Sequence, residues 1–120
     1  PMTLLSGKRI LIVEDEPLIA MTVEDMIIEM GGIPVGPASN VAEGLRLADE
    51  GGLDGALLDV NLNGGRSDDI AHRLASHGVP YIFATGYGRN GVEGFPDAPV
   101  IAKPYRSETL AQMLAALIGQ

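Results

Sequence analysis

The sequence predicts an α/β fold, a doubly wound five-stranded parallel sheet. Continuous apolar runs such as 10–13 and 81–84 are typical of strands buried on both faces, which occur mainly in parallel sheets. Segments with apolar residues at helical spacing separate these runs, and the connections are short. This alternation of strand and helix favours the doubly wound arrangement. The length of 120 residues suits one domain, 1–120, with no output domain in this chain.

The first quarter of the chain predicts a strand, a helix and a second strand. The first strand ends at Val13, and Pro17 suits the first turn of the helix that follows. Apolar residues then recur at helical spacing until Gly31-Gly32 ends the helix. The second strand, 33–35, is short and is weakened by flanking prolines.

The middle of the chain repeats this order. Asn40 with Glu43 forms an N-cap signal of the capping-box type, which begins a short second helix. The third strand is expected over 55–58 and leads into a Gly/Asn loop over 61–66. Ser67 then caps a third helix.

One helix is missing between the fourth strand, 79–84, and the fifth, 100–102. Each interior glycine costs a helix about 1 kcal/mol relative to alanine. The intervening residues that oppose a helix are Gly88, Gly91, Gly94 and Pro96. We therefore expect a loop over 86–97 that lacks packed apolar contacts and is mobile, becoming more ordered on activation. Ser107 is expected to cap the last helix.

The composition excludes several classes of protein. The net charge is −8, from 16 acidic and 8 basic residues, whereas a direct nucleic-acid binder shows a basic face. The absence of cysteine excludes disulfides and thiolate metal sites. No signal-peptide pattern opens the chain, and no apolar stretch reaches the roughly 18 residues of a membrane span. We therefore expect no direct contact with nucleic acid, no membrane contact and a cytoplasmic location.

Charged and hydroxyl side chains follow four of the predicted strands at the point where each strand ends. Glu14 and Asp15 follow the first strand, Asp59 the third, Thr85 the fourth and Lys103 the fifth. The carboxyl ends of parallel strands meet at one edge of a sheet, where α/β proteins bind their ligands. The sequence therefore predicts one site that contains all five side chains.

The acidic members of this set are suited to a magnesium ion. Mg²⁺ prefers oxygen ligands and takes one or two carboxylates beside its waters and phosphate oxygens. Asp15 and Asp59 fit as direct ligands, Glu14 fits through a water molecule, and the backbone carbonyl of Asn61 can complete the shell. An aspartate in such a site can also accept a phosphoryl group.

The remaining members are suited to a phosphoryl group. An anionic carboxylate that attacks an anionic phosphate is repelled, and a metal ion and a fixed cation reduce that repulsion. Lys103 supplies the cation. The Thr85 hydroxyl can donate to a phosphoryl oxygen. Gly86 is small and therefore leaves a backbone N–H accessible.

These residues, in this order and at these strand ends, resemble a response-regulator receiver domain over essentially the whole chain. The resemblance implies the flavodoxin-like (βα)5 receiver fold, here with a degenerate or mobile fourth helix. It implies that Asp59 is the phosphoacceptor and that Glu14, Asp15, Asp59 and the Asn61 carbonyl hold Mg²⁺. It also implies a cis peptide bond between Lys103 and Pro104. A cytoplasmic histidine kinase or a histidine phosphotransfer protein would supply the phosphoryl group in two-component signalling, and a protein of unknown identity would receive the output.

A finer resemblance is to the FAT-GUY subfamily, whose members are often stand-alone receivers. It is carried by the motif Phe83-Ala84-Thr85-Gly86-Tyr87-Gly88 and by Lys103-Pro104-Tyr105 followed by Leu110. Many receivers carry a switch aromatic three residues before the lysine, but this chain has Val100 there. Tyr87 and Tyr105 are candidates for switch or partner contacts in its place.

Three alternatives are kept beside this interpretation. The chain could be a pseudo-receiver that is never phosphorylated and only docks proteins. It could be a small phosphatase of the aspartyl-phosphate type, although Asp59-Val60-Asn61 follows the third strand and not the first. It could also be a flavin-binding flavodoxin, which would need a hydroxyl- and glycine-rich loop in place of the acidic loop 14–17.

Overall fold

A five-stranded parallel sheet forms the centre of the molecule in the computed structural model, which describes residues 4–86 and 88–119. The strands lie in the order β2-β1-β3-β6-β7, and all neighbouring pairs are parallel. Their bounds are β1 Arg9–Val13, β2 Ile33–Ala38, β3 Gly55–Asp59, β6 Tyr81–Thr85 and β7 Val100–Ala102. The predicted fold class is confirmed.

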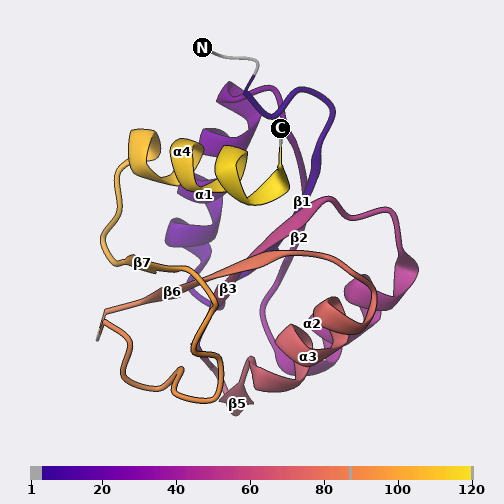
Figure 1. Cartoon of the computed structure of the whole chain (residues 1–120), viewed down its shortest axis with the longest axis vertical. Helices are drawn as coiled ribbons and strands as arrows, with labels where there is room; N and C mark the ends of the chain where they lie inside the picture. Colours follow the sequence, from indigo (N-terminus) through magenta and orange to yellow (C-terminus); the bar gives the residue numbers. More distant parts are fainter. Residues whose placement is uncertain (1–3, 87, 120) are drawn as a thin grey trace.

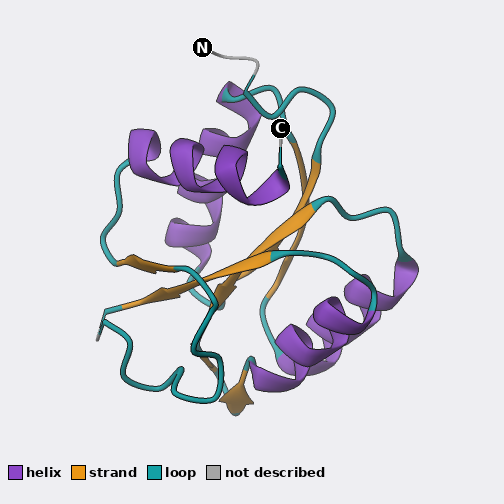
Figure 2. Cartoon of the chain, in the orientation of Figure 1, coloured by secondary structure: helices purple, strands orange, loops and turns teal. Residues whose placement is uncertain are grey.

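Helices cover both faces of the sheet (Figures 1 and 2). Helices α1 (Pro17–Glu29) and α4 (Ser107–Ile118) lie on one face, and α2 (Val41–Glu50) and α3 (Asp68–Ser76) lie on the other. Because side chains alternate along a strand, β1 contributes to two separate apolar cores. Ile10 and Ile12 pack in the core on the α1 and α4 side, and Leu11 and Val13 pack in the core on the α2 and α3 side. None of the described helices is both long and apolar enough to cross a membrane.

The helix starts agree only in part with the sequence signals. Asn40 caps α2 as predicted, since its Oδ1 accepts a hydrogen bond of 2.9 Å from the Glu43 N–H. Ser67 occupies the N-cap position of α3 as predicted, but its side chain makes no capping hydrogen bond, because the buried hydroxyl donates to the carbonyl of Val60 at 3.4 Å. The predicted cap of α4 is wrong, because Ser107 is the first helical residue of α4.

Three strands extend beyond the carboxyl ends of their predicted ranges, and β6 begins at Tyr81, two residues later than predicted. β2 continues beyond Val35 to Ala38 and includes two prolines, which an edge strand tolerates because one side of its backbone is unpaired. β3 includes Asp59 and β6 includes Thr85, so both polar residues are held within strands. The expected loop 61–66 contains a short antiparallel hairpin, formed by β4 (Asn61–Leu62) and β5 (Gly65–Arg66).

The segment between β6 and β7 is a loop, as predicted. Its described residues, 86 and 88–99, form turns and contain no helix. The expectation that it lacks packed apolar contacts is wrong, because Val92 is only 1% exposed and the Phe95 ring lies 5.1 Å from the ring of Phe83. Successive turns, and not a helical period, bring these apolar side chains onto the core. Its mobility and its ordering on activation stay predictions.

Helices α2 and α3 pack closely at Gly44, where a larger residue is expected to destabilise the fold. A β-carbon at Gly44 would overlap the side chain of Ile70, which is fully buried. Overpacking of a core costs roughly 1–3 kcal/mol, so we expect Gly44→Val to lower the free energy of unfolding by about that amount. Urea denaturation measures it. Ala42→Val, on the exposed side of the same helix, is the matched control, and equal stability of the two variants would contradict the packing described here.

Candidate functional site

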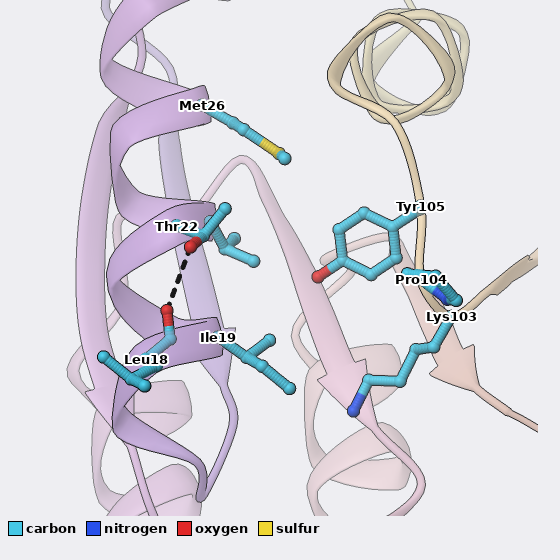
Figure 3. Close-up of a pocket in the computed structure, with 8 residues that line it drawn as sticks. Leu18, Ile19, Thr22, Met26, Lys103, Pro104 and Tyr105 are labelled. Carbon is cyan, nitrogen blue, oxygen red and sulfur yellow. Dashed lines mark hydrogen bonds between the residues drawn. The ribbon is translucent and has the colours of Figure 1, made fainter.

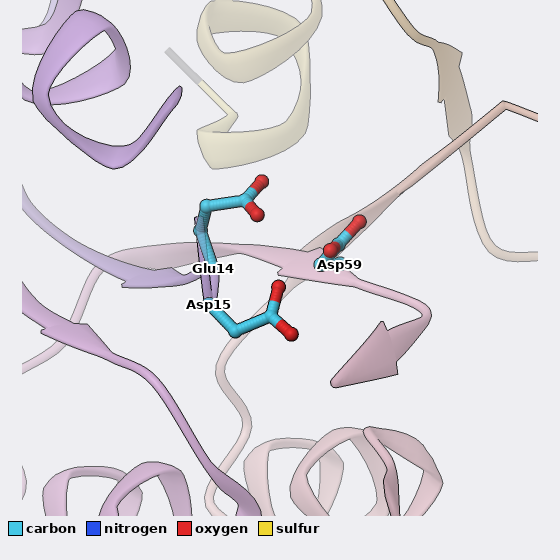
Figure 4. A group of neighbouring side chains, drawn as sticks. All are labelled: Glu14, Asp15 and Asp59. Carbon is cyan, nitrogen blue, oxygen red and sulfur yellow. The ribbon is translucent and has the colours of Figure 1, made fainter. Parts of the chain in front are cut away.

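Three carboxylates meet at the carboxyl edge of the sheet (Figure 4). Glu14 and Asp15 follow β1 directly, and Asp59 is the last residue of β3, the strand that pairs with β1. One carboxylate oxygen from each of the three lies within 4.8 Å of the others. Oxygen ligands at this spacing fit a hard divalent cation such as Mg²⁺.

A single ammonium group bridges two of these carboxylates. Lys103 Nζ lies 2.7 Å from Asp59 Oδ1 and 3.2 Å from Glu14 Oε1. The side chains of Lys103, Asp59 and Glu14 are 20%, 12% and 4% exposed, so water screens these ion pairs only in part. One cation among three carboxylates leaves an excess of negative charge that a metal ion can compensate.

Burial perturbs the pKa values of all three partners. Burial raises the pKa of Asp59, although the hydrogen bond from Lys103 opposes the rise, and burial likewise raises the pKa of Glu14. For Lys103, burial favours the neutral amine, but the hydrogen bond and charge of Asp59, together with Glu14, raise the pKa above its ordinary value. The pocket therefore stabilises the lysine as a cation and penalises the full ionisation of its carboxylates.

Glu14 is fixed by contacts to both of its carboxylate oxygens. Oε1 faces Lys103, and Oε2 accepts a hydrogen bond of 3.1 Å from the backbone N–H of Glu16. The Glu14 backbone is also held, because its N–H donates to the Ala38 carbonyl at 2.9 Å. Asp15 is less buried than Glu14. The arrangement therefore suits Asp15 to direct contact with a metal ion and Glu14 to a more distant position.

A pocket of about 390 Å³ opens beside Asp59. Asn61, Thr85, Gly86 and Lys103 line it, so the structure brings the predicted phosphoryl-binding residues to one side of Asp59. Thr85 is buried, and nothing lies within 4 Å of the position that a β-carbon at Gly86 would occupy. The pocket therefore leaves space for a ligand at Gly86.

Pairing between β6 and β7 fixes Thr85 and Lys103 relative to each other. The backbone N–H of Lys103 donates to the Thr85 carbonyl at 2.9 Å. The peptide bond between Lys103 and Pro104 is cis, in agreement with the resemblance. The hydroxyl is thus carried by the last residue of β6, and the ammonium group by the residue that follows the adjacent strand β7.

Tyr105 lies next to this site, in the wall of a second pocket of about 460 Å³ against α1 (Figure 3). Its hydroxyl points toward the helix in the view of Figure 3. Burial, followed by the negative charges of Glu14 and Asp59, raises the pKa of Tyr105. Val100 packs against the core on the α2 and α3 side. Tyr87, the other candidate for switch contacts, lies outside the described residues.

Comparison with known proteins identifies the family. The family described as the response regulator receiver domain matches residues 10–115. The chain belongs to this family. It is 44% identical to SdrG from Sphingomonas melonis Fr1, whose solution structure superposes with a TM-score of 0.81 and is matched over 98% of this chain and 99% of that one. The BeF3-activated conformation of SdrG is also similar, with a TM-score of 0.79.

The chain is also similar to part of a longer regulator and to the receiver domain of a sensor kinase. The chain is 34% identical over 111 residues to the phyllosphere-induced regulator PhyR of Methylorubrum extorquens. That match covers 88% of this chain and 42% of PhyR, so the chain spans about half the length of such curated relatives. The receiver domain of the sensor histidine kinase PA1611 from Pseudomonas aeruginosa is 23% identical, with a TM-score of 0.80 over 96% of this chain and 100% of that one, and shares the fold.

The sequence did not indicate three residues that organise the surroundings of the site. Arg66 and Arg89 donate hydrogen bonds to backbone carbonyls of the loop between β6 and β7, and Phe95 anchors that loop on the core. Contacts with backbone carbonyls leave no signature in residue spacing. Of the three, only Phe95 could have been found from the sequence, because it is an apolar residue within a polar, glycine-rich stretch.

The raised pKa of Asp59 has a consequence for the pH dependence of stability. The folded state takes up a proton on Asp59 at higher pH than the unfolded state, so ionised Asp59 opposes folding above its folded pKa. We expect Asp59→Asn to be more stable than the wild type at about pH 7, and the difference to shrink as the pH falls toward about 4, the ordinary carboxyl value. The contribution of Lys103 is constant here, since it is lost only as the pH rises through its own raised pKa.

Urea denaturation of both proteins across this pH range measures the difference. Groups that do not interact with Asp59 cancel in the comparison, and the charge of Asp59 also raises the pKa of Glu14, which shifts the difference in the same direction. A difference in unfolding free energy that does not depend on pH would contradict the assigned effect of burial on Asp59.

Proposed function

We propose that this protein is a phosphorylation-dependent switch that accepts a phosphoryl group on Asp59 in a Mg²⁺-dependent reaction and then changes its protein-binding surface. The proposal takes 1–120 as one receiver domain. Its phosphoryl donor is a cytoplasmic histidine kinase or a histidine phosphotransfer protein, and its output partner is another protein. In this proposal the chain acts on its own phosphorylation state and not as an enzyme on a separate substrate.

One observation carries the proposal most directly: the ammonium group of Lys103 lies 2.7 Å from an oxygen of Asp59, within a partly buried acidic cluster. A docking module has no need of a buried aspartate that is held by a lysine beside two further carboxylates. The open space at Gly86, beside Thr85, gives a transferred group a place to lie.

The residues that would hold Mg²⁺ are Asp15 and Asp59 by direct contact, Glu14 through water, and Asn61 through its backbone carbonyl. A bound Mg²⁺ would supply positive charge that neutralises the oxygens of the phosphoryl group. The spacing of the three carboxylates supports this assignment. The magnesium ion coordinated in the cleft of the PA1611 receiver domain agrees with it.

The transfer step follows from these positions. A carboxylate oxygen of Asp59 forms a bond to phosphorus as the bond from phosphorus to the donor imidazole nitrogen breaks, and the electron pair of that bond stays on the imidazole. The Lys103 ammonium stabilises the charge on the phosphoryl oxygens. The Thr85 hydroxyl and the backbone N–H of Gly86 donate hydrogen bonds to those oxygens.

The relatives support the proposal and refine it. SdrG, which is matched over nearly the whole length of both chains, has been described in a BeF3-activated conformation. On its own motif, 83–88, we assign this chain to the FAT-GUY subfamily, and Tyr105 and Tyr87 are its candidates for switch or partner contacts. The Tyr105 ring lies next to Lys103 in the wall of the pocket and extends toward α1, which supports its part in this role.

We predict that Asp59 is the sole phosphoacceptor. Incubation with acetyl phosphate and Mg²⁺ should add the mass of one phosphoryl group to the wild type and none to Asp59→Asn, because Asp59 is the carboxylate that lines the pocket together with Thr85 and Lys103. Intact-mass spectrometry measures the addition. Asp54→Asn, at the opposite end of β3, is the matched control and should be phosphorylated normally. Phosphorylation of Asp59→Asn at the wild-type rate would exclude the assignment.

We also predict that Mg²⁺ binding requires Asp15. Even residues that only support metal ligands change affinity by roughly 10- to 100-fold, so loss of a direct ligand should weaken Mg²⁺ binding at least about tenfold. Isothermal titration calorimetry measures Mg²⁺ affinity, and mass spectrometry tests whether beryllofluoride binding is lost with it. Asp25→Ala, an exposed aspartate on α1, is the control. Unchanged Mg²⁺ affinity in Asp15→Ala would place the metal ion elsewhere.

A further inference from the structure

Residues 88–98, which we call the strap, form a folded element where the fourth helix of the predicted fold would lie. Three successive turns run along it, with backbone hydrogen bonds from Val92 to Arg89, from Phe95 to Val92 and from Ala98 to Phe95, at 3.2, 2.9 and 3.2 Å. Val92 is buried in the core on the α2 and α3 side. The Phe95 ring packs against three other rings, those of His72, Tyr81 and Phe83.

The side chain of Arg89 closes the strap on itself. Its guanidinium donates to the carbonyls of Phe95, Pro96 and Ala98 at 2.8, 3.2 and 2.9 Å. Hydrogen bonds from a charged donor are stronger than neutral ones, and the planar fork of arginine holds several acceptors in fixed geometry. The two ends of the strap are therefore tied together, and the strap can respond as a unit.

The side chain of Arg66 fastens the middle of the strap to the β4–β5 hairpin. Its Nη2 donates to the carbonyl of Gly91, and its Nε donates to Asp68 Oδ1 at 2.8 Å. A β-carbon at Gly91 would lie 3.6 Å from Arg66 Nη1 and 3.6 Å from Val60 Cγ1, so the glycine backbone sits against both side chains. Figure 1 shows the strap beside β5. The φ angle of Gly91, 94°, also favours glycine at this contact.

The hairpin that carries Arg66 begins immediately after the acidic pocket. Val60, the neighbour of Asp59, is 2% exposed, and its carbonyl accepts hydrogen bonds from Ser67 N–H at 3.0 Å and from Ser67 Oγ at 3.4 Å. Asn61, which lines the pocket, pairs with Arg66 across the hairpin. One buried residue, Val60, and one strand pair, Asn61 with Arg66, thus connect Asp59 to Arg66.

We propose that Arg66 couples the acidic pocket to the strap: through its hydrogen bond to Gly91, a phosphoryl group on Asp59 changes how firmly residues 88–98 are held. The coupling is conformational and rests on the proposed phosphorylation of Asp59. The strap joins β6, which carries Thr85, to β7, which leads to Lys103. The strap is therefore connected to the pocket at both of its ends, and through Arg66 at its middle.

Amide hydrogen exchange tests this coupling in the whole chain. Arg66→Met keeps the aliphatic stem and removes every donor, and Arg46→Met, an exposed arginine paired with Glu50 on α2, is the matched control. In the absence of ligands, we expect the amides of Val92, Phe95 and Ala98 to exchange at least about threefold faster in Arg66→Met than in the wild type. Arg46→Met should exchange like the wild type. Equal protection in Arg66→Met and the wild type would show that Arg66 does not fasten the strap.

The second arm adds beryllofluoride with Mg²⁺ as the phosphoryl analogue. Strap protection should change on binding in the wild type, and this change should shrink at least about twofold in Arg66→Met. Coupling between two sites is reciprocal, so the affinity for beryllofluoride should also change at least about twofold in that variant and not in Arg46→Met. The coupling would be overturned if beryllofluoride changed strap protection equally in Arg66→Met and Arg46→Met. It would also be overturned if beryllofluoride left strap protection in the wild type unchanged.

The two arms separate this inference from the proposed function. A wild-type protein that does not bind beryllofluoride would contradict the phosphoacceptor assignment and the coupling together. The first arm would then still decide whether Arg66 fastens the strap. A wild type that binds beryllofluoride with no change in strap exchange would contradict the coupling alone.

Discussion

The ion pair between Lys103 and Asp59 is the interaction on which the site depends. Without it, three carboxylates would share a partly buried pocket, and no other described side chain forms an ion pair with them. Charges in such surroundings are costly unless they are paired, so the lysine stabilises the ionised carboxylates and holds a cation at the edge of the pocket. Burial, with a smaller contribution from the neighbouring negative charges, raises the pKa values of Glu14 and Asp59. The excess of negative charge makes a divalent cation a favourable addition.

The parallel sheet makes this pairing possible. Lys103 and Asp59 are 44 residues apart, and they meet because β6 lies between β3 and β7 and pairs with both. The backbone bond from Lys103 to Thr85 sets the register at the same edge. The ends of the strands therefore supply the residues of the site, and the helices cover the two faces of the sheet.

Sequence alone was sufficient for the fold and for the strand-end residues, because both follow from local pattern. An apolar run followed by Asp59 or by Thr85 identifies the strand and its edge together, and parallel topology then brings the edges to one place. The failures have a common physical cause. The hydroxyl of Ser67 bonds to Val60 and does not cap a helix, and Arg66 and Arg89 bind backbone carbonyls of the strap. The spacing of residue types in a sequence cannot reveal a hydrogen bond whose acceptor is a backbone carbonyl, since every residue has one.

A double-mutant cycle tests the central claim most directly, since it isolates the interaction between Lys103 and Asp59 from the burial of each. Unfolding free energies would be measured in urea for the wild type, Lys103→Met, Asp59→Asn and the double variant. Loss of the lysine should cost at least about 1 kcal/mol more in the wild-type background than in Asp59→Asn, because only there does it leave Asp59 ionised beside two other carboxylates. Costs that agree within about 0.5 kcal/mol in the two backgrounds would contradict the account.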